Sequence, residues 1–126
     1  MIQKHNKKKN KFAYLDTNVV LIADKIGYWN FVKLSKKYDL ILTIGVMAEI
    51  RKISQSTNRI LWALIKRNYI SIISEGQGQS FDCYALKLNR LRCEIISLDK
   101  TLRAKYYKNK KVPIVLSRNK FITFNA

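Results

Sequence analysis

The sequence contains few of the residues that usually hold structural metals or form disulfides. It has one histidine, His5, and two cysteines, Cys83 and Cys93, which are not in a C-x-x-C arrangement. These soft and imidazole ligands are too few for a structural zinc site. We therefore expect both cysteines to be reduced and mostly buried in a cytoplasmic protein.

Long apolar runs are also missing. No uncharged apolar stretch reaches the roughly 18 residues that a membrane-spanning helix needs, so we expect no membrane partner. Asp16 and Asn18 interrupt the apolar residues 12–22 that follow the basic N-terminus, which speaks against a secretory signal. The 126 residues suffice for the core of one domain. We expect this domain at residues 12–126, with residues 1–11 as a flexible basic arm.

Acidic residues are scarce. The chain has 25 Lys and Arg against 8 Asp and Glu, giving a net charge of +17. A lysine-rich surface produced by biased composition would normally bring glutamates with it. The imbalance therefore favours a polyanionic partner, above all a nucleic acid. An anionic membrane surface is a weaker competitor, because no long amphipathic helix is present.

Apolar segments alternate with segments of helical periodicity along the whole chain. Solid Ile/Leu/Val runs predict buried strands at residues 12–16, 40–44, 69–73, 94–98 and 112–116. Helical spacing predicts helices at residues 19–25, 28–38, 57–68, 80–91 and 100–110, and another that begins after Gly45. This alternation predicts an α/β fold: a central, mainly parallel five-stranded sheet with helices on both faces.

Four of the eight acids fall where predicted strands give way to helices. Asp16 and Asp99 end strands, whereas Glu49 and Asp82 lie in the first turns of the helices that follow. Singly, each could be a helix cap or a dipole partner. If the four carboxylates meet at one edge of a parallel sheet, each pair would repel by about 1–4 kcal/mol at a separation of about 4 Å, for effective dielectric constants from about 80 down to about 20. Such a pocket predicts a bound divalent cation, and carboxylate oxygens suit Mg²⁺ or Mn²⁺.

Four short motifs carry a resemblance to a known family. They are YLDTN at residues 14–18, VMAEI at 46–50, SFDC at 80–83 and ISLDKTL at 96–102. In this order and spacing they resemble the motifs of the PIN-domain nucleases, and the similarity runs from about residue 12 to residue 124. Residues 46–53 and 82–114 look closest to the PIN nucleases that process small-subunit ribosomal RNA.

The resemblance implies a PIN fold and a metal-dependent endoribonuclease that holds one or two Mg²⁺ or Mn²⁺ ions. By matched position the metal ligands and catalytic residues would be Asp16, Glu49, Asp82 and Asp99. Asn18 would orient Asp16, and Ser97 would support Asp99 through hydrogen bonds. Thr17 would either join them or serve only as a helix-start hydroxyl.

Two positions depart from the ribosomal branch. Phe81 stands where that branch often carries a second acid, which leaves the number of metal ions open. Ser97 replaces the more frequent threonine, which is a chemically mild change.

Basic residues surround the predicted acidic pocket and are expected to hold RNA phosphates. The residues expected to do so are Lys7, Lys8, Lys9, Arg51, Lys52, Arg59, Lys100, Arg103, Arg118 and Lys120. Tyr28 and Trp29 are candidates for stacking on unpaired bases, although core packing is the more frequent role of such residues.

Three functions remain open on the sequence. The leading hypothesis is an endoribonuclease that acts on precursor ribosomal RNA, with RNA and ribosome-assembly proteins as partners; a homodimer is compatible with it. The first alternative is a toxin ribonuclease of a toxin–antitoxin pair. The second is a non-catalytic RNA-binding scaffold of ribosome assembly. The basic arm argues against the toxin, and the retained acids argue against the scaffold.

Overall fold

A computed structural model describes residues 11–53, 58–74, 93–108 and 110–124, and the structural statements below concern these residues. The predicted helix at 80–91, Asp82, Cys83, Lys7, Lys8 and Lys9 lie outside them. Within these ranges we find no helix that is long and apolar enough to cross a membrane.

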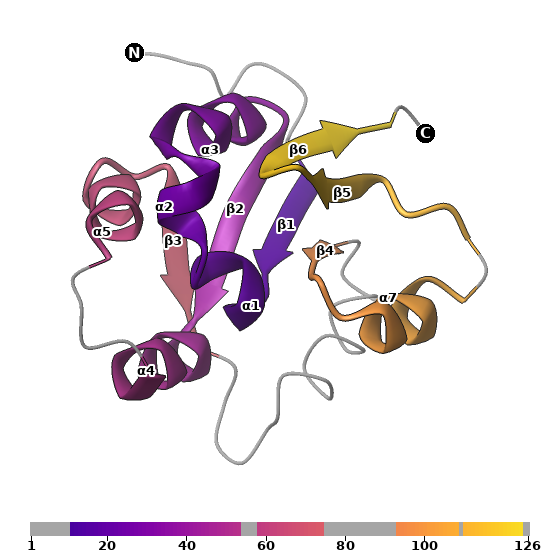
Figure 1. The fold of residues 1–126 in the computed structure, drawn as a ribbon, viewed down its shortest axis with the longest axis horizontal. Coiled ribbons are helices and arrows are strands. Elements are labelled where there is room, and N and C mark those ends of the chain that lie inside the picture. Colours follow the sequence, from indigo (N-terminus) through magenta and orange to yellow (C-terminus); the bar gives the residue numbers. More distant parts are fainter. Residues whose placement is uncertain (1–10, 54–57, 75–92, 109, 125–126) are drawn as a thin grey trace.

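The centre of the fold is a parallel sheet of four strands (Figure 1). The strands are β1 Lys11–Leu15, β2 Tyr38–Thr43, β3 Ile70–Ile73 and β4 Cys93–Ile96. Their order is β3-β2-β1-β4, so β1 pairs with both β2 and β4. The four strands correspond to the first four predicted from the apolar runs, and the parallel arrangement is confirmed.

Helices flank this sheet, as predicted. They are α1 Thr17–Val20, α2 Ala23–Ile26, α3 Tyr28–Ser35, α4 Ile44–Ile53, α5 Arg59–Lys66 and α7 Lys100–Tyr107. The single helix expected at residues 19–25 is instead two short helices, α1 and α2. Gly27 ends α2 at φ 95°, a backbone angle that L side chains rarely adopt, and the chain turns there into α3.

The prediction of a fifth strand in the central sheet is wrong. β5 Ile114–Ser117 pairs antiparallel with β6 Lys120–Thr123 in a separate two-stranded sheet. Arg118 and Asn119 both have positive φ, at 52° and 63°, as a two-residue hairpin turn of type I′ requires. The chain therefore folds back at once and gives β5 an antiparallel partner.

The outer edge of β4 is already occupied by α7. The backbone N–H of Ile95 donates to the Tyr107 hydroxyl at 3.0 Å, and the Tyr106 hydroxyl donates to the Cys93 carbonyl. A fifth strand would need these same backbone groups. This explains why β5 lies beside β4 without joining its ladder.

The core lies between the sheet and the helices. Fully buried side chains include Tyr14, Leu42, Leu64 and Ile95. Cys93 is buried as predicted, and burial raises the pKa of its thiol to about 12. The carboxyl ends of β1 and β4 are held side by side by this core, and the candidate site begins there.

Candidate active site

Asp16 follows β1 directly and is one of the few buried charged or polar residues in the described ranges, with 8% of the residue exposed. Its backbone N–H donates to the Ile96 carbonyl at 3.0 Å, which extends the β1–β4 pairing past the end of β1. The carboxylate caps α1, because Oδ1 accepts from the N–H of Thr17 at 2.7 Å. Oδ2 accepts from the Ser97 hydroxyl at 2.5 Å. The orientation of Asp16 is thus fixed from two sides.

Ser97 connects three of the predicted site residues. Besides donating to Asp16, its Oγ accepts from the backbone N–H of Asp99 at 3.0 Å and from Nδ2 of Asn18 at 3.4 Å. One donor and two acceptors are the full capacity of a hydroxyl group. Asn18 reaches Asp16 through Ser97, and its Oδ1 accepts from the N–H of Leu98 at 3.1 Å.

Glu49 comes to the same edge from α4. Oε1 of this exposed carboxylate accepts from the Thr17 hydroxyl at 2.9 Å. Thr17 is the first residue of α1 and directly follows Asp16. Its hydroxyl therefore does more than start a helix, because it ties α4 to the end of β1.

Asp99 has a clear structural role at the start of α7. Its Oδ1 accepts from the N–H groups of Thr101 and Leu102 at 2.9 and 3.1 Å. This is the N-cap interaction that an aspartate alone would suggest. The backbone just before it is held by Arg103, whose Nη1 donates to the Ser97 carbonyl at 2.5 Å.

The charges of Glu49 and Asp99 reach the carboxylate of Asp16. The pKa of Asp16 is raised, mainly because burial disfavours the charged form. Hydrogen bonds from Ser97 and Thr17 oppose this effect, whereas the negative charges of Asp99 and Glu49 add to it. Asp16, Glu49 and Asp99 are therefore brought to one edge of the sheet. The fourth predicted acid, Asp82, lies outside the residues that the structure describes.

The oxygen donors at this edge are of the kind that Mg²⁺ and Mn²⁺ prefer. Oδ2 of Asp99 and Oε2 of Glu49 accept no hydrogen bond from the described part of the chain. Within that part, no three His, Cys, Asp or Glu side chains form a group that could hold a metal ion. The carboxylate oxygens suit a divalent cation, but the carboxylates among the described residues do not by themselves form a complete set of metal ligands.

The predicted RNA-binding residues differ in their availability. Most are exposed: Arg51 and Lys52 at the end of α4, Arg59 at the start of α5, Lys100 at the start of α7, and Arg118 and Lys120 in the hairpin. Arg103 is only partly exposed and is engaged with the Ser97 carbonyl. Arg51 lies over the Trp62 ring, 5.9 Å from its centroid.

Thr43 is a positioning residue that the sequence patterns did not single out. It is fully buried at the end of β2, and its Oγ1 accepts from the N–H of Val46 at 3.1 Å, capping α4. The same hydroxyl lies 3.0 Å from the Tyr14 hydroxyl on β1. A threonine between a strand and a helix is the signal that could have identified it. Through this contact the start of α4, and with it Glu49, is fixed relative to β1.

The parallel sheet and its flanking helices match a PIN-like α/β fold. A solved structure that matches the chain is described as "Structure of the PIN domain endonuclease Utp24", with a TM-score of 0.57 and 19% identity over 87% of this chain and 88% of that chain. No model of a protein family and no curated protein matches the sequence. At this identity, the likeness shows the fold.

Proposed function

We propose that the protein is a metal-dependent endoribonuclease that hydrolyses phosphodiester bonds in RNA. The observation that carries the proposal is the environment of Asp16. Asp16 is a buried residue where β1 ends; its burial raises the pKa of its carboxyl, and the charges of Asp99 and Glu49 add to this effect. Repulsion between the acids at this edge disfavours the folded state, and a bound cation would offset it. A functional site is the usual reason for such an arrangement.

The protein's own residues would hold and orient the ion. Asp16, Glu49 and Asp99, together with Asp82, would be its ligands. Ser97 and Thr17 would keep the first two carboxylates in place through the hydrogen bonds described above. A divalent ion in such a site supplies an activated water and stabilises the leaving oxygen.

RNA is the proposed substrate because of charge and resemblance. The net charge of +17 favours a polyanion, and exposed arginines and lysines lie on the elements that carry the acids. The motifs resemble those of the ribosomal-RNA-processing branch, and the matching structure is that of a PIN domain endonuclease. We therefore propose precursor ribosomal RNA as the substrate, in the cytoplasm and alongside ribosome-assembly proteins.

One observation favours a second candidate, a non-catalytic RNA-binding scaffold. Three of the predicted ligands are among the described residues, and they do not form a metal-binding group by themselves. A scaffold would bind RNA equally well with and without divalent ions. A nuclease would need them for cleavage.

The test is cleavage of a labelled fragment of precursor ribosomal RNA in the presence of Mn²⁺. The wild type should give discrete products, and Asp16→Asn and Asp82→Asn should give none. Asp24→Asn is the matched control, because Asp24 is an exposed acid on α2 and is not among the predicted ligands. Identical product patterns for the wild type and Asp82→Asn would refute the nuclease. RNA binding without any cleavage would support the scaffold.

A further inference from the structure

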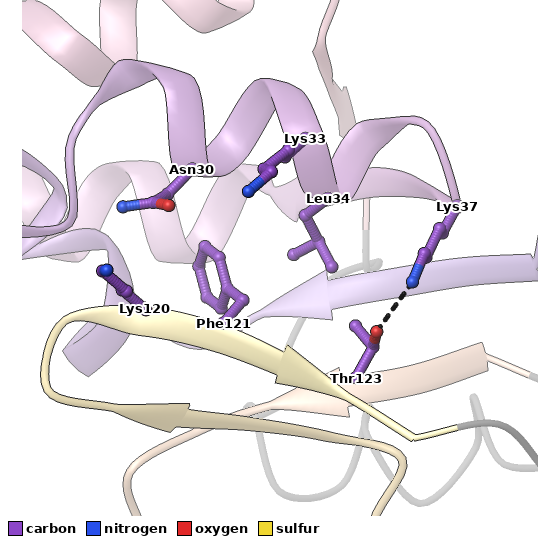
Figure 2. A pocket seen from close by; sticks show the side chains of 7 residues that line it. All are labelled: Asn30, Lys33, Leu34, Lys37, Lys120, Phe121 and Thr123. Atoms are coloured by element: carbon purple, nitrogen blue, oxygen red, sulfur yellow. Dashed lines mark hydrogen bonds between the residues drawn. The ribbon is translucent and has the colours of Figure 1, made fainter.

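A basic pocket lies between α3 and the hairpin strand β6 (Figure 2). Its volume is about 230 Å³, and its lining includes three lysines, Lys33, Lys37 and Lys120. The polar groups beside them are Asn30 and Thr123. In Figure 1, α3 and β6 lie at the top of the view, whereas α1 and α4 lie lower, near the ends of β1 and β2. Of the candidate metal ligands, the three that the structure describes, Asp16, Glu49 and Asp99, do not line this pocket.

The positive charges of the pocket are not neutralised by its lining residues. Among the described residues, no acidic side chain lines the pocket. Nζ of Lys37 donates to Oγ1 of Thr123 at 2.9 Å, which joins the two walls of the pocket. Within the described ranges, Lys33 and Lys120 form no hydrogen bond and no ion pair, so their ammonium groups remain available to an anion. Three like charges around one small space favour an anionic ligand.

The apolar floor keeps the pocket open. Leu34 is buried, and the Phe121 ring packs edge-on against the buried Phe31 ring, with 5.1 Å between the centroids. Figure 2 shows Phe121 between the lysines that come from the two walls. The lysines are therefore carried by packed elements, and the pocket is preformed before a ligand binds.

An exposed tryptophan lies on the same helix as Lys33. The side chain of Trp29 is 74% exposed, which is unusual for so large an apolar group. Trp29 and Lys33 are four residues apart on α3 and so lie on the same helical face. Trp29 contacts Tyr28 edge-on at 5.0 Å, and the Tyr28 hydroxyl accepts from Nη1 of Arg67 at 3.0 Å. The ring thus has a packed neighbour and is otherwise largely exposed.

We propose that the pocket binds a backbone phosphate of single-stranded RNA and that Trp29 stacks on an unpaired base next to it. Lysines supply the charge that a phosphate requires, and an exposed aromatic ring supplies the stacking surface that an unpaired base requires. A free phosphate or an acidic peptide would use the charge but not the ring. That the strand is RNA rests on the proposed function.

The first experiment measures RNA binding in EDTA, so that cleavage plays no part. The affinity for a short fluorescein-labelled single-stranded RNA is followed by anisotropy over a range of KCl concentrations. Lys33→Gln with Lys120→Gln should lower the affinity and reduce the slope of log K against log salt by about 0.7 for each phosphate that the variant no longer binds. The matched control is Lys66→Gln with Lys105→Gln, two exposed lysines outside the pocket. Equal slopes for the two double variants would overturn the proposal.

The second experiment tests the stacking. The chain has two tryptophans, Trp29 and Trp62, so Trp62→Phe leaves Trp29 as the sole reporter. Its fluorescence should be quenched by the RNA and much less by an abasic strand of equal length. Equal quenching by both strands would overturn the stacking. Inorganic phosphate or an acidic peptide that binds the pocket as tightly as RNA would overturn the choice of ligand.

These outcomes are separable from those of the nuclease test. If the wild type does not cleave RNA but the Lys33→Gln, Lys120→Gln variant has a reduced salt slope, the phosphate-binding pocket is supported and the nuclease function is refuted. If the wild type cleaves RNA with Mn²⁺ but the variant's salt slope is unchanged, only the proposal for the pocket is refuted.

Discussion

The Ser97 hydroxyl donates a 2.5 Å hydrogen bond to Oδ2 of Asp16, although 81 positions separate the two residues. The sheet makes this possible, because Leu15 and Ile96 are register partners in the parallel pairing of β1 with β4. Asp16 directly follows β1 and Ser97 directly follows β4, so the two residues lie side by side. Two chain segments that end at the same edge place a carboxylate and its donor in contact.

Removal of the negative charge at Asp16 should abolish the response of the protein to Mn²⁺. Burial and the neighbouring acids raise the pKa of this carboxylate, so a bound cation should stabilise the folded state. At a Mn²⁺ concentration about 100 times Kd, the wild type should gain about 2.7 kcal/mol, seen as a higher Tm. Asp16→Asn should show no such gain, and its cleavage should fall by about 100-fold or more. Asp24→Asn should behave like the wild type; an equal Mn²⁺ shift in Asp16→Asn would contradict the site.

Loss of the Ser97 hydroxyl should weaken metal binding without unfolding the protein. Ser97→Ala removes the donor to Asp16 and the acceptor for the N–H of Asp99, at a cost of about 1–3 kcal/mol in stability. The Mn²⁺ affinity, measured by calorimetry, should fall by about 10–100-fold. Ser97→Thr keeps the hydroxyl and should restore most of the affinity. Equal losses for both variants would mean that packing, not the hydroxyl, is what matters.

The Thr43 hydroxyl should stabilise the fold through its contacts with the N–H of Val46 and the Tyr14 hydroxyl. Thr43→Val leaves the N–H of Val46 and the Tyr14 hydroxyl without this partner, so the free energy of unfolding should fall by about 1–3 kcal/mol. A double-mutant cycle in urea with Tyr14→Phe should give a coupling energy of about 0.5 kcal/mol or more. Additive losses would show that the interaction between the two hydroxyls contributes nothing.

Alkaline pH should destabilise the protein partly through Cys93. Burial raises the pKa of this thiol from 9.0 to about 12, so the folded state binds more protons than the unfolded state between these values. The stabilisation is complete below about pH 9 and is lost as the pH rises toward 12. Burial also raises the pKa values of Tyr106 and Tyr107, so part of this dependence should remain in Cys93→Ala.

The measurement is urea unfolding of the wild type and Cys93→Ala at several pH values above 9. The variant should lose a constant amount of stability from the cavity and show a shallower decline with pH. Parallel curves for the two proteins would contradict the assignment to Cys93.

The sequence alone determined the α/β class and the parallel sheet. A strand that is apolar at nearly every position, such as residues 40–44, must be covered on both faces of the sheet. The segments of helical spacing between the strands predict the helices that cover it. Because strands of one direction end at one edge, the positions of Asp16, Glu49 and Asp99 along the chain also indicated that they lie near each other.

Only the tertiary structure decided the rest. Residues 112–116 read like any other buried strand, and their exclusion from the sheet depends on Tyr106 and Tyr107, which occupy the edge of β4 from a different element. Likewise, the two walls of the basic pocket come from distant parts of the sequence, since 86 positions separate Lys37 from Thr123, and they meet because Phe121 packs on Phe31. Local periodicity reflects the neighbours of a residue along the chain, whereas edge occupancy and pockets depend on contacts between distant segments.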